Sequence, residues 1–159
     1  MLGFPIPALC LSSSHMLKAL SMFGYLAMVG GLVGLLITRN LLSPSPFVIA
    51  PQVAAVALMI WARVTFGRRS FHLAANPTAG GLVTTGPYRF IRHPIYTAVC
   101  LLVSAGAAAH LSWSAFLLCA LVWGGAIARM FCEERLVVRQ FPEYRQYAAS
   151  TSRMIPFVF

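Results

Sequence analysis

The sequence predicts an all-α membrane protein with about four transmembrane helices. Hydrophobic residues make up 59% of the chain and charged residues only 9%, whereas soluble domains carry roughly 25% charged residues. A chain so poor in charge cannot cover a water-exposed surface, and we therefore expect it to lie in a bilayer. It contains no internal repeat or low-complexity tract, so we treat residues 1–159 as a single integral membrane domain.

Four apolar segments approach the length that crosses a membrane. About 20 helical residues, each rising about 1.5 Å, span the roughly 30 Å hydrocarbon core. The predicted helices are Ala19–Thr38, Phe47–Phe66, Ile95–Ala109 and Trp113–Phe131. The first is too long for the apolar core of a signal peptide and has no convincing cleavage site after it, so we interpret it as a retained helix. The third is short for a full span.

Turn and packing signals predict how these helices meet. The first helix carries small residues that favour close helix packing, namely Gly24, Gly30, Gly31 and Gly34. Only His110–Ser112 separates the third and fourth helices, which predicts a tight antiparallel hairpin. The tail 133–149 is typical of a helix interrupted near Pro142. We expect the apolar residues 154–159 to return to the membrane interface.

The arginine distribution predicts the orientation in the membrane. The net charge is +9, and the arginines gather in the connector 67–94 and in the tail after the fourth helix, while the loop 41–46 and the turn 110–112 carry none. The positive-inside rule places both termini and the connector in the cytoplasm. The arginines flank apolar spans instead of forming one basic face, so we expect contacts with membrane lipids and none with nucleic acid.

Two polar segments are thereby expected at the same membrane face. One is GPYRFIRHPIY, from Gly86 to Tyr96, and the other follows the fourth helix and holds every acidic residue of the chain, Glu133, Glu134 and Glu143. An adjacent glutamate pair in a chain so poor in acids indicates recognition of an amine or a ribose diol. The alternative for Glu133 is a simple helix-surface pair with Arg129, four residues earlier.

The first polar segment offers candidates of its own. Pro94 suits the first turn of a helix, which places His93 at the mouth of the third helix. His93 could contact a ligand or accept a proton, or it could be an interfacial histidine satisfied by water. Tyr96 lies one turn further in, where an aromatic-belt role is the alternative. Arg89 and Arg153 could hold a carboxylate or phosphate, or contact lipid headgroups. No metal-ligand spacing and no phosphate-loop or hydrolase motif occurs in the sequence.

Together these segments resemble the isoprenylcysteine carboxyl methyltransferase family and the related phospholipid methyltransferases. The resemblance covers about residues 80–156, which we take as the methyltransferase motif region. The family's RHPxxY element corresponds to Arg92, His93 and Pro94, with Tyr96 in the looser spacing RHPxY, and its glutamate pair to Glu133 and Glu134. Its distal tyrosines and arginine correspond to Tyr144, Tyr147 and Arg153. The resemblance implies a cytosolic-face pocket for S-adenosylmethionine, built by the connector 67–94 and the C-terminal helix.

The function that the resemblance implies is S-adenosylmethionine-dependent methylation of a small membrane-embedded amphiphile. The chain offers many guanidiniums and few bases, which favours a carboxylate acceptor over a phenol or an amine. The alternatives are N-methylation of phosphatidylethanolamine, a non-catalytic adaptor, or a small transporter, against which the lack of mid-span ionisable residues argues. We expect a bacterial inner-membrane protein. The candidate catalytic residues are Arg89, Arg153 and His93, and the candidate cofactor-binding residues are His93, Pro94, Tyr96, Glu133, Glu134 and Tyr88, with no metal ligands.

Overall fold

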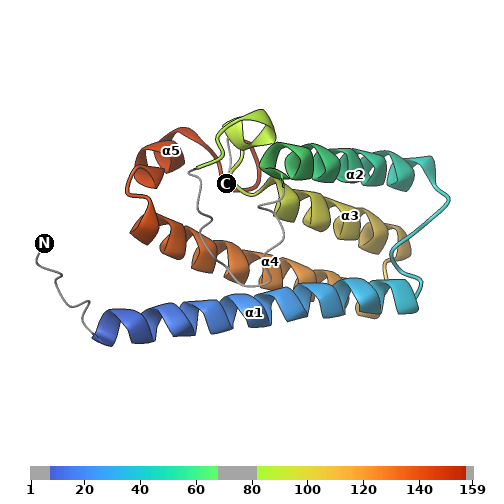
Figure 1. The fold of residues 1–159 in the computed structure, drawn as a ribbon. Coiled ribbons are helices and arrows are strands. Elements are labelled where there is room, and N and C mark those ends of the chain that lie inside the picture. The colour runs from blue at the N-terminus through green and yellow to red at the C-terminus, as the bar shows by residue number, and fades with distance from the viewer. Residues whose placement is uncertain (1–7, 68–81, 157–159) are drawn as a thin grey trace, which may run out of the picture.

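The computed structural model describes residues 8–67 and 82–156, and these residues form a helical bundle (Figure 1). The elements are α1 (Ala8–Ile37), α2 (Pro46–Phe66), the short 3-10 helix η2 (Gly86–Arg89), α3 (Pro94–His110), α4 (Trp113–Gln140) and α5 (Tyr144–Ser150). In the described ranges the one extended pairing is an isolated parallel bridge between Ile91 and Ser152. The predicted all-α class is confirmed.

The helices have the lengths that a membrane requires. Residues Ser14–Ile37 of α1, all of α2 and all of α4 are long and apolar enough to cross a bilayer. Helix α3 is apolar but has 17 residues, which cover only about 25 Å at 1.5 Å per residue. The expected set of about four spans therefore consists of three full-length helices and one shorter helix.

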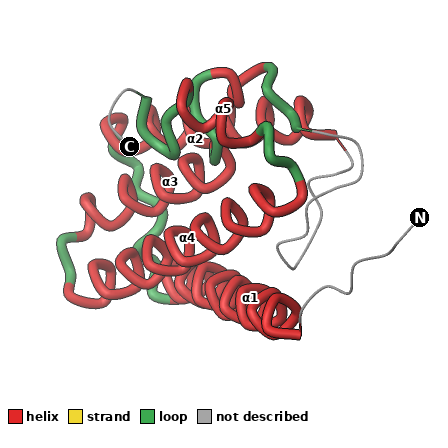
Figure 2. The backbone as a smooth tube through the Cα atoms, turned by 90° about the vertical axis from the view of Figure 1, so that its left-hand side faces the viewer, coloured by secondary structure: helices red, strands yellow, loops and turns green. Residues whose placement is uncertain are grey.

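The bundle is made of two helix pairs. Helix α1 packs along α4, and α2 packs along α3, while the α3–α4 hairpin joins the pairs (Figures 1 and 2). Leu111 adopts a left-handed conformation with φ of 45° and ends α3. Ser112 then caps α4 by accepting a hydrogen bond from the backbone N–H of Ala115 at 3.1 Å. The predicted tight hairpin is thus confirmed, and only Leu111 and Ser112 lie between its two helices because His110 is the last residue of α3.

Glycines set the close approach of α1 and α4. A Cβ atom on Gly125 would lie 2.5 Å from the carbonyl oxygen of Gly24, so the two backbones touch at this crossing. Gly31 and Gly34 likewise face α4, at Val122 and Leu118. These contacts agree with the packing role that we predicted for the first helix. Gly30 differs, because a Cβ there would meet no atom within 4 Å.

Two helices are longer than predicted. Helix α1 begins at Ala8, before the predicted Ala19, because the intervening residues include no glycine or proline that would stop a helix. Helix α4 continues to Gln140 for the same reason, and the chain breaks only at Phe141 and Pro142, as predicted. The two extensions support each other, since Leu17 of α1 packs against Cys132 and Leu136 of α4.

The glycine crossing can be tested with two adjacent positions. Gly125→Ala places a methyl group against the backbone of α1, and we expect it to lower the free energy of unfolding by about 1–3 kcal/mol. Gly124→Ala is the matched control, because a Cβ there meets no atom within 4 Å and alanine favours helix by up to about 1 kcal/mol. Thermal unfolding in detergent measures both variants. Equal melting temperatures for the two would contradict the crossing.

Candidate active site

Both polar segments of the sequence meet at one end of the bundle. The start of α3, the last part of α4, helix α5 and the chain after α5 all lie there (Figure 1). We name the polar residues in contact at this end the carboxylate cluster; they are Arg92, His93, Tyr96, Arg129, Glu133, Glu134, Tyr144 and Arg153.

Glu134 is the centre of one half of the cluster. Its Oε1 accepts a hydrogen bond from Arg92 Nε at 2.8 Å and lies 3.3 Å from His93 Nε2. The Tyr144 hydroxyl donates to the same oxygen at 3.3 Å. Its Oε2 accepts from Arg153 Nε at 3.1 Å. This carboxylate, which has no partner one turn earlier in α4, is therefore held by residues from three other parts of the chain.

Glu133 forms the other half. Its Oε1 accepts from the Tyr96 hydroxyl at 2.6 Å and from Arg129 Nε at 3.0 Å, which confirms the predicted pair with Arg129. Its Oε2 lies 4.0 Å from His93 Nδ1. The Glu133 side chain is 24% exposed, against 13% for Glu134. Oε2 of Glu133 is thus the carboxylate oxygen of the pair with the weakest contacts to described residues.

His93 links the two halves. Its two ring nitrogens face the two glutamates, and its ring stacks on Tyr96 with centroids 5.7 Å apart. The side chain is 9% exposed, so the alternative of a histidine satisfied by bulk water does not hold. Pro94 is buried as the first residue of α3, as predicted, and it fixes the direction in which His93 leaves the helix.

The segment Thr151–Met154, here named the C-terminal strap, fixes the backbone around His93. Arg92 and His93 donate their backbone N–H groups to the carbonyls of Ser152 and Arg153 at 2.8 and 2.9 Å. The Arg92 side chain also donates to the carbonyls of Ala148, at 2.9 Å, and Thr151. The position of the histidine therefore depends on a segment about 60 residues further along the chain.

The strap carries Met154, the first residue of the segment 154–159 that we expect at the membrane interface, into the protein core. Ile155 and Pro156 are exposed, so the position of the rest of this segment stays a prediction. Met154 is fully buried in the protein core, and its carbonyl accepts a hydrogen bond from the Thr97 hydroxyl at 2.9 Å. This position inside the protein is favourable because the hydrogen bonds of the strap satisfy backbone groups that lipid could not satisfy. Residues 157–159 lie outside the described part of the chain.

Two tyrosines of α5 cover the cluster. Burial raises the pKa of the Tyr147 phenol to about 12, and burial followed by the charge of Glu134 raises the pKa of the Tyr144 phenol above its usual value. Both hydroxyls are therefore protonated hydrogen-bond donors at neutral pH. Tyr147 uses its proton to bind the carbonyl of Tyr88 at 2.6 Å.

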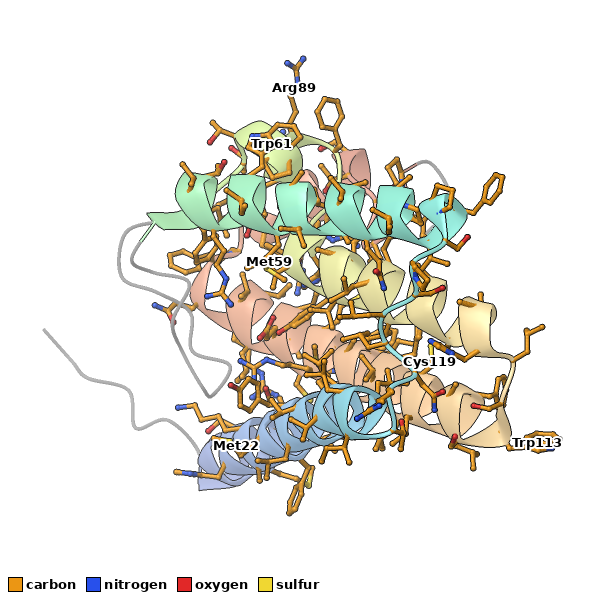
Figure 3. All side chains as sticks on the ribbon, turned by 90° about the vertical axis from the view of Figure 1, so that its right-hand side faces the viewer. Met22, Met59, Trp61, Arg89, Trp113 and Cys119 are labelled. Carbon is orange, nitrogen blue, oxygen red and sulfur yellow. The ribbon has the colours of Figure 1, made fainter. Side chains whose placement is uncertain are left out.

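The structure does not bring every predicted site residue to the cluster. The ring of Tyr88 packs against Phe66 of α2, with centroids 5.4 Å apart. Arg89 is exposed and projects outward beyond α2, and it forms no ion pair with any residue of the described ranges (Figure 3). Of the connector 67–94, residues 68–81 lie outside the described part, so its share in the pocket stays a prediction.

Sequence reasoning assigned no role to Arg92, although it stands in the motif beside His93. Its guanidinium contacts Glu134, the carbonyl of Ala148 in α5 and the carbonyl of Thr151 at the start of the strap. The signal that could have found it is the charge balance, because a buried acid at position 134 needs a cation from outside its own helix.

An apolar helical bundle with spans of this length is an integral membrane protein, and this one carries a charged cluster at one end of its helices. The family model described as phospholipid methyltransferase matches residues 47–144, which is more than half of the chain. The chain belongs to the phospholipid methyltransferase family and is a membrane methyltransferase. No curated protein and no solved structure matches it. The matched range includes both glutamates and His93 but ends before the strap.

The role of Arg92 can be tested against its exposed neighbour in the same segment. Arg92→Ala removes the shortest ion pair of Glu134 and the guanidinium that binds the carbonyls of Ala148 and Thr151, and we expect the free energy of unfolding to fall by about 2–3 kcal/mol. Arg89→Ala is the matched control, with an expected change within about 0.5 kcal/mol. Chemical unfolding in detergent micelles gives both values. Similar losses for the two variants would show that Arg92 does not hold the cluster together.

Proposed function

We propose that the protein transfers a methyl group from S-adenosylmethionine to a membrane-embedded amphiphile at headgroup depth. The observation that supports this most is the carboxylate cluster at one end of an apolar bundle in a chain of the phospholipid methyltransferase family. At the end of an apolar bundle, a water-soluble methyl donor can reach these side chains from the water, and a lipid-like acceptor can reach them from the bilayer.

The residues present suit S-adenosylmethionine. That molecule supplies an electrophilic methyl group on a sulfonium, together with an amine and a ribose diol that need hydrogen-bond acceptors. Glu133 Oε2 is an acceptor of this kind, on a half-buried side chain. We assign His93, Pro94, Tyr96, Glu133 and Glu134 to binding this molecule, with Tyr88 acting indirectly through its contact with Tyr147. These residues increase the rate of methyl transfer by excluding water and by holding S-adenosylmethionine in a fixed orientation.

The ion pairs of the two glutamates favour a carboxylate as the methyl acceptor. Glu134 lies between Arg92 and Arg153, and Glu133 is paired with Arg129; a carboxylate beside a guanidinium is a weak base. A carboxylate acceptor is ionised at neutral pH and needs no base, only a cation to hold it. Arg153 is suited to that task because its side chain is 35% exposed, whereas Arg92 and Arg129 are buried.

A second candidate is N-methylation of phosphatidylethanolamine, which the family description favours. That acceptor is an ammonium at neutral pH and must lose a proton before it can be methylated. His93 has the imidazole of the cluster, which could take this proton, and Arg153 would then hold the lipid phosphate.

The two acceptors give products that differ in chemistry. Purified protein is incubated with S-adenosylmethionine carrying a labelled methyl group, together with either an N-acetyl-S-alkylcysteine or phosphatidylethanolamine vesicles. We expect label in a methyl ester of the acid, which mild base releases as methanol, because no free base is needed for that transfer. Label that base does not release as methanol and that stays on the amine of the phospholipid headgroup would instead establish the amine as the acceptor. No transfer to either would contradict the proposed function.

Binding of the methyl donor can be tested with a matched pair of glutamates. Glu133→Gln removes the charge that faces the amine or diol, and we expect S-adenosylmethionine to bind about 10- to 100-fold more weakly, the effect of losing a hydrogen bond to a charged group. Glu143→Gln is the control, because Glu143 is exposed before α5. Isothermal calorimetry measures both. Wild-type affinity in Glu133→Gln would exclude this residue from the donor site.

A further inference from the structure

We propose that the apolar chain of the acceptor is received between α3 and α4, directly beneath the carboxylate cluster, and that Trp123 sets the length of chain that is accepted. This inference rests on the proposed function, because it requires an acceptor with one polar end and one apolar chain. Its parts are an adaptable apolar layer below the cluster and a fixed side chain at the bottom of that layer.

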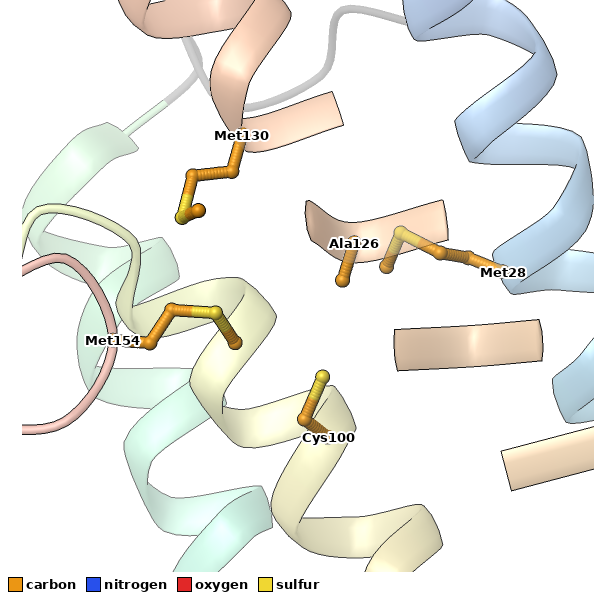
Figure 4. Packing of buried hydrophobic residues seen from close by; sticks show 5 residues of the cluster. All are labelled: Met28, Cys100, Ala126, Met130 and Met154. Atoms are coloured by element: carbon orange, nitrogen blue, oxygen red, sulfur yellow. The ribbon is translucent and has the colours of Figure 1, made fainter. Parts of the chain in front are cut away.

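The layer below the cluster consists of five buried residues, Met28, Cys100, Ala126, Met130 and Met154 (Figure 4). Tyr96 connects it to the polar site, since its hydroxyl binds Glu133 while its ring packs against this layer. A substrate whose polar end contacts the cluster would therefore have its apolar part at these methionines.

The composition of this layer suits an exchangeable occupant. Methionine is unbranched and has three rotatable bonds, so it can repack around an inserted group. The three methionines come from α1, from α4 and from the C-terminal strap. Their side chains can therefore change conformation around an inserted chain without the movement of any one helix. The next apolar layer towards the far end contains Leu35, Leu41, Val103, Ala115 and Val122. Valines there have stiff side chains, and the adaptable region ends where they begin.

Trp123 lies at that boundary. Its ring packs against the methionine layer, and its indole Nε1–H donates to the Ser104 hydroxyl at 3.0 Å. Trp123 is on α4 and Ser104 is on α3, so this hydrogen bond fixes the ring across the space between the two helices. Ten residues separate Trp123 from Glu133 along α4, which corresponds to a depth of about 15 Å. We infer that a chain longer than this depth meets the fixed indole.

The test uses N-acetyl-S-alkylcysteines with linear alkyl chains of increasing length. We expect Trp123→Ala to move the optimum of kcat/KM to longer chains, with a gain of about tenfold for an acid two methylene groups beyond the wild-type optimum, as burial of those groups gives. Equilibrium binding of the same acids, measured without the methyl donor, should shift to longer chains in the same way.

Two further variants keep the test decisive. Ser104→Ala leaves the indole in place but removes its hydrogen-bond acceptor, so we expect a smaller shift in the same direction, even if Trp123→Ala does not fold. Trp113→Ala is the matched control, because Trp113 begins the same helix and is 82% exposed; its length profile should equal that of the wild type.

An unchanged length profile in Trp123→Ala and Ser104→Ala, with an active wild-type protein, would overturn the role of Trp123 and leave the proposed function intact. A shift in Trp113→Ala as large as in Trp123→Ala would overturn it too. Failure of the wild-type protein to methylate any acid of the series would overturn the carboxylate acceptor, and this inference with it.

Discussion

The site depends on the sharing of Glu134 between Arg92 and Arg153. A carboxylate buried at the end of an apolar bundle is costly to hold unless cations and hydrogen-bond donors surround it, and this chain has few acids with which to balance its arginines. Arg92 connects that carboxylate to the start of the strap, and Arg153 connects it to the strap itself. One ion-pair network thereby fixes the entry of α3, the end of α4 and the chain after α5 relative to one another.

The bilayer explains why the helices are arranged as they are. Helices in lipid gain little from burying apolar side chains, so close backbone contact and internal hydrogen bonds decide which helices pair. Gly24 and Gly125 allow the close backbone contact between α1 and α4. The hydrogen bond from Trp123 to Ser104 connects α3 and α4.

Much of this could be predicted from the sequence, because local patterns carry it. Hydropathy located the helices, the short turn at His110–Ser112 gave the hairpin, and the four-residue spacing gave the pair of Arg129 with Glu133. The partners of Glu134 could not be found in this way, since they depend on a bridge between Ile91 and Ser152 that no local pattern marks. The sequence also did not predict that Arg89 is exposed on the surface, because a motif gives the neighbours of a residue in sequence but not the direction of its side chain.

The C-terminal strap also has a consequence for biosynthesis. The ribosome makes helices α1 to α4 first, and domains generally fold from the N-terminal side during synthesis. The backbone partners of Arg92 and His93 lie in residues 152 and 153, so they emerge only after helices α1 to α5 have been made. A nascent chain can therefore be inserted into the membrane while its histidine is still without its final backbone partners, and the site is completed last.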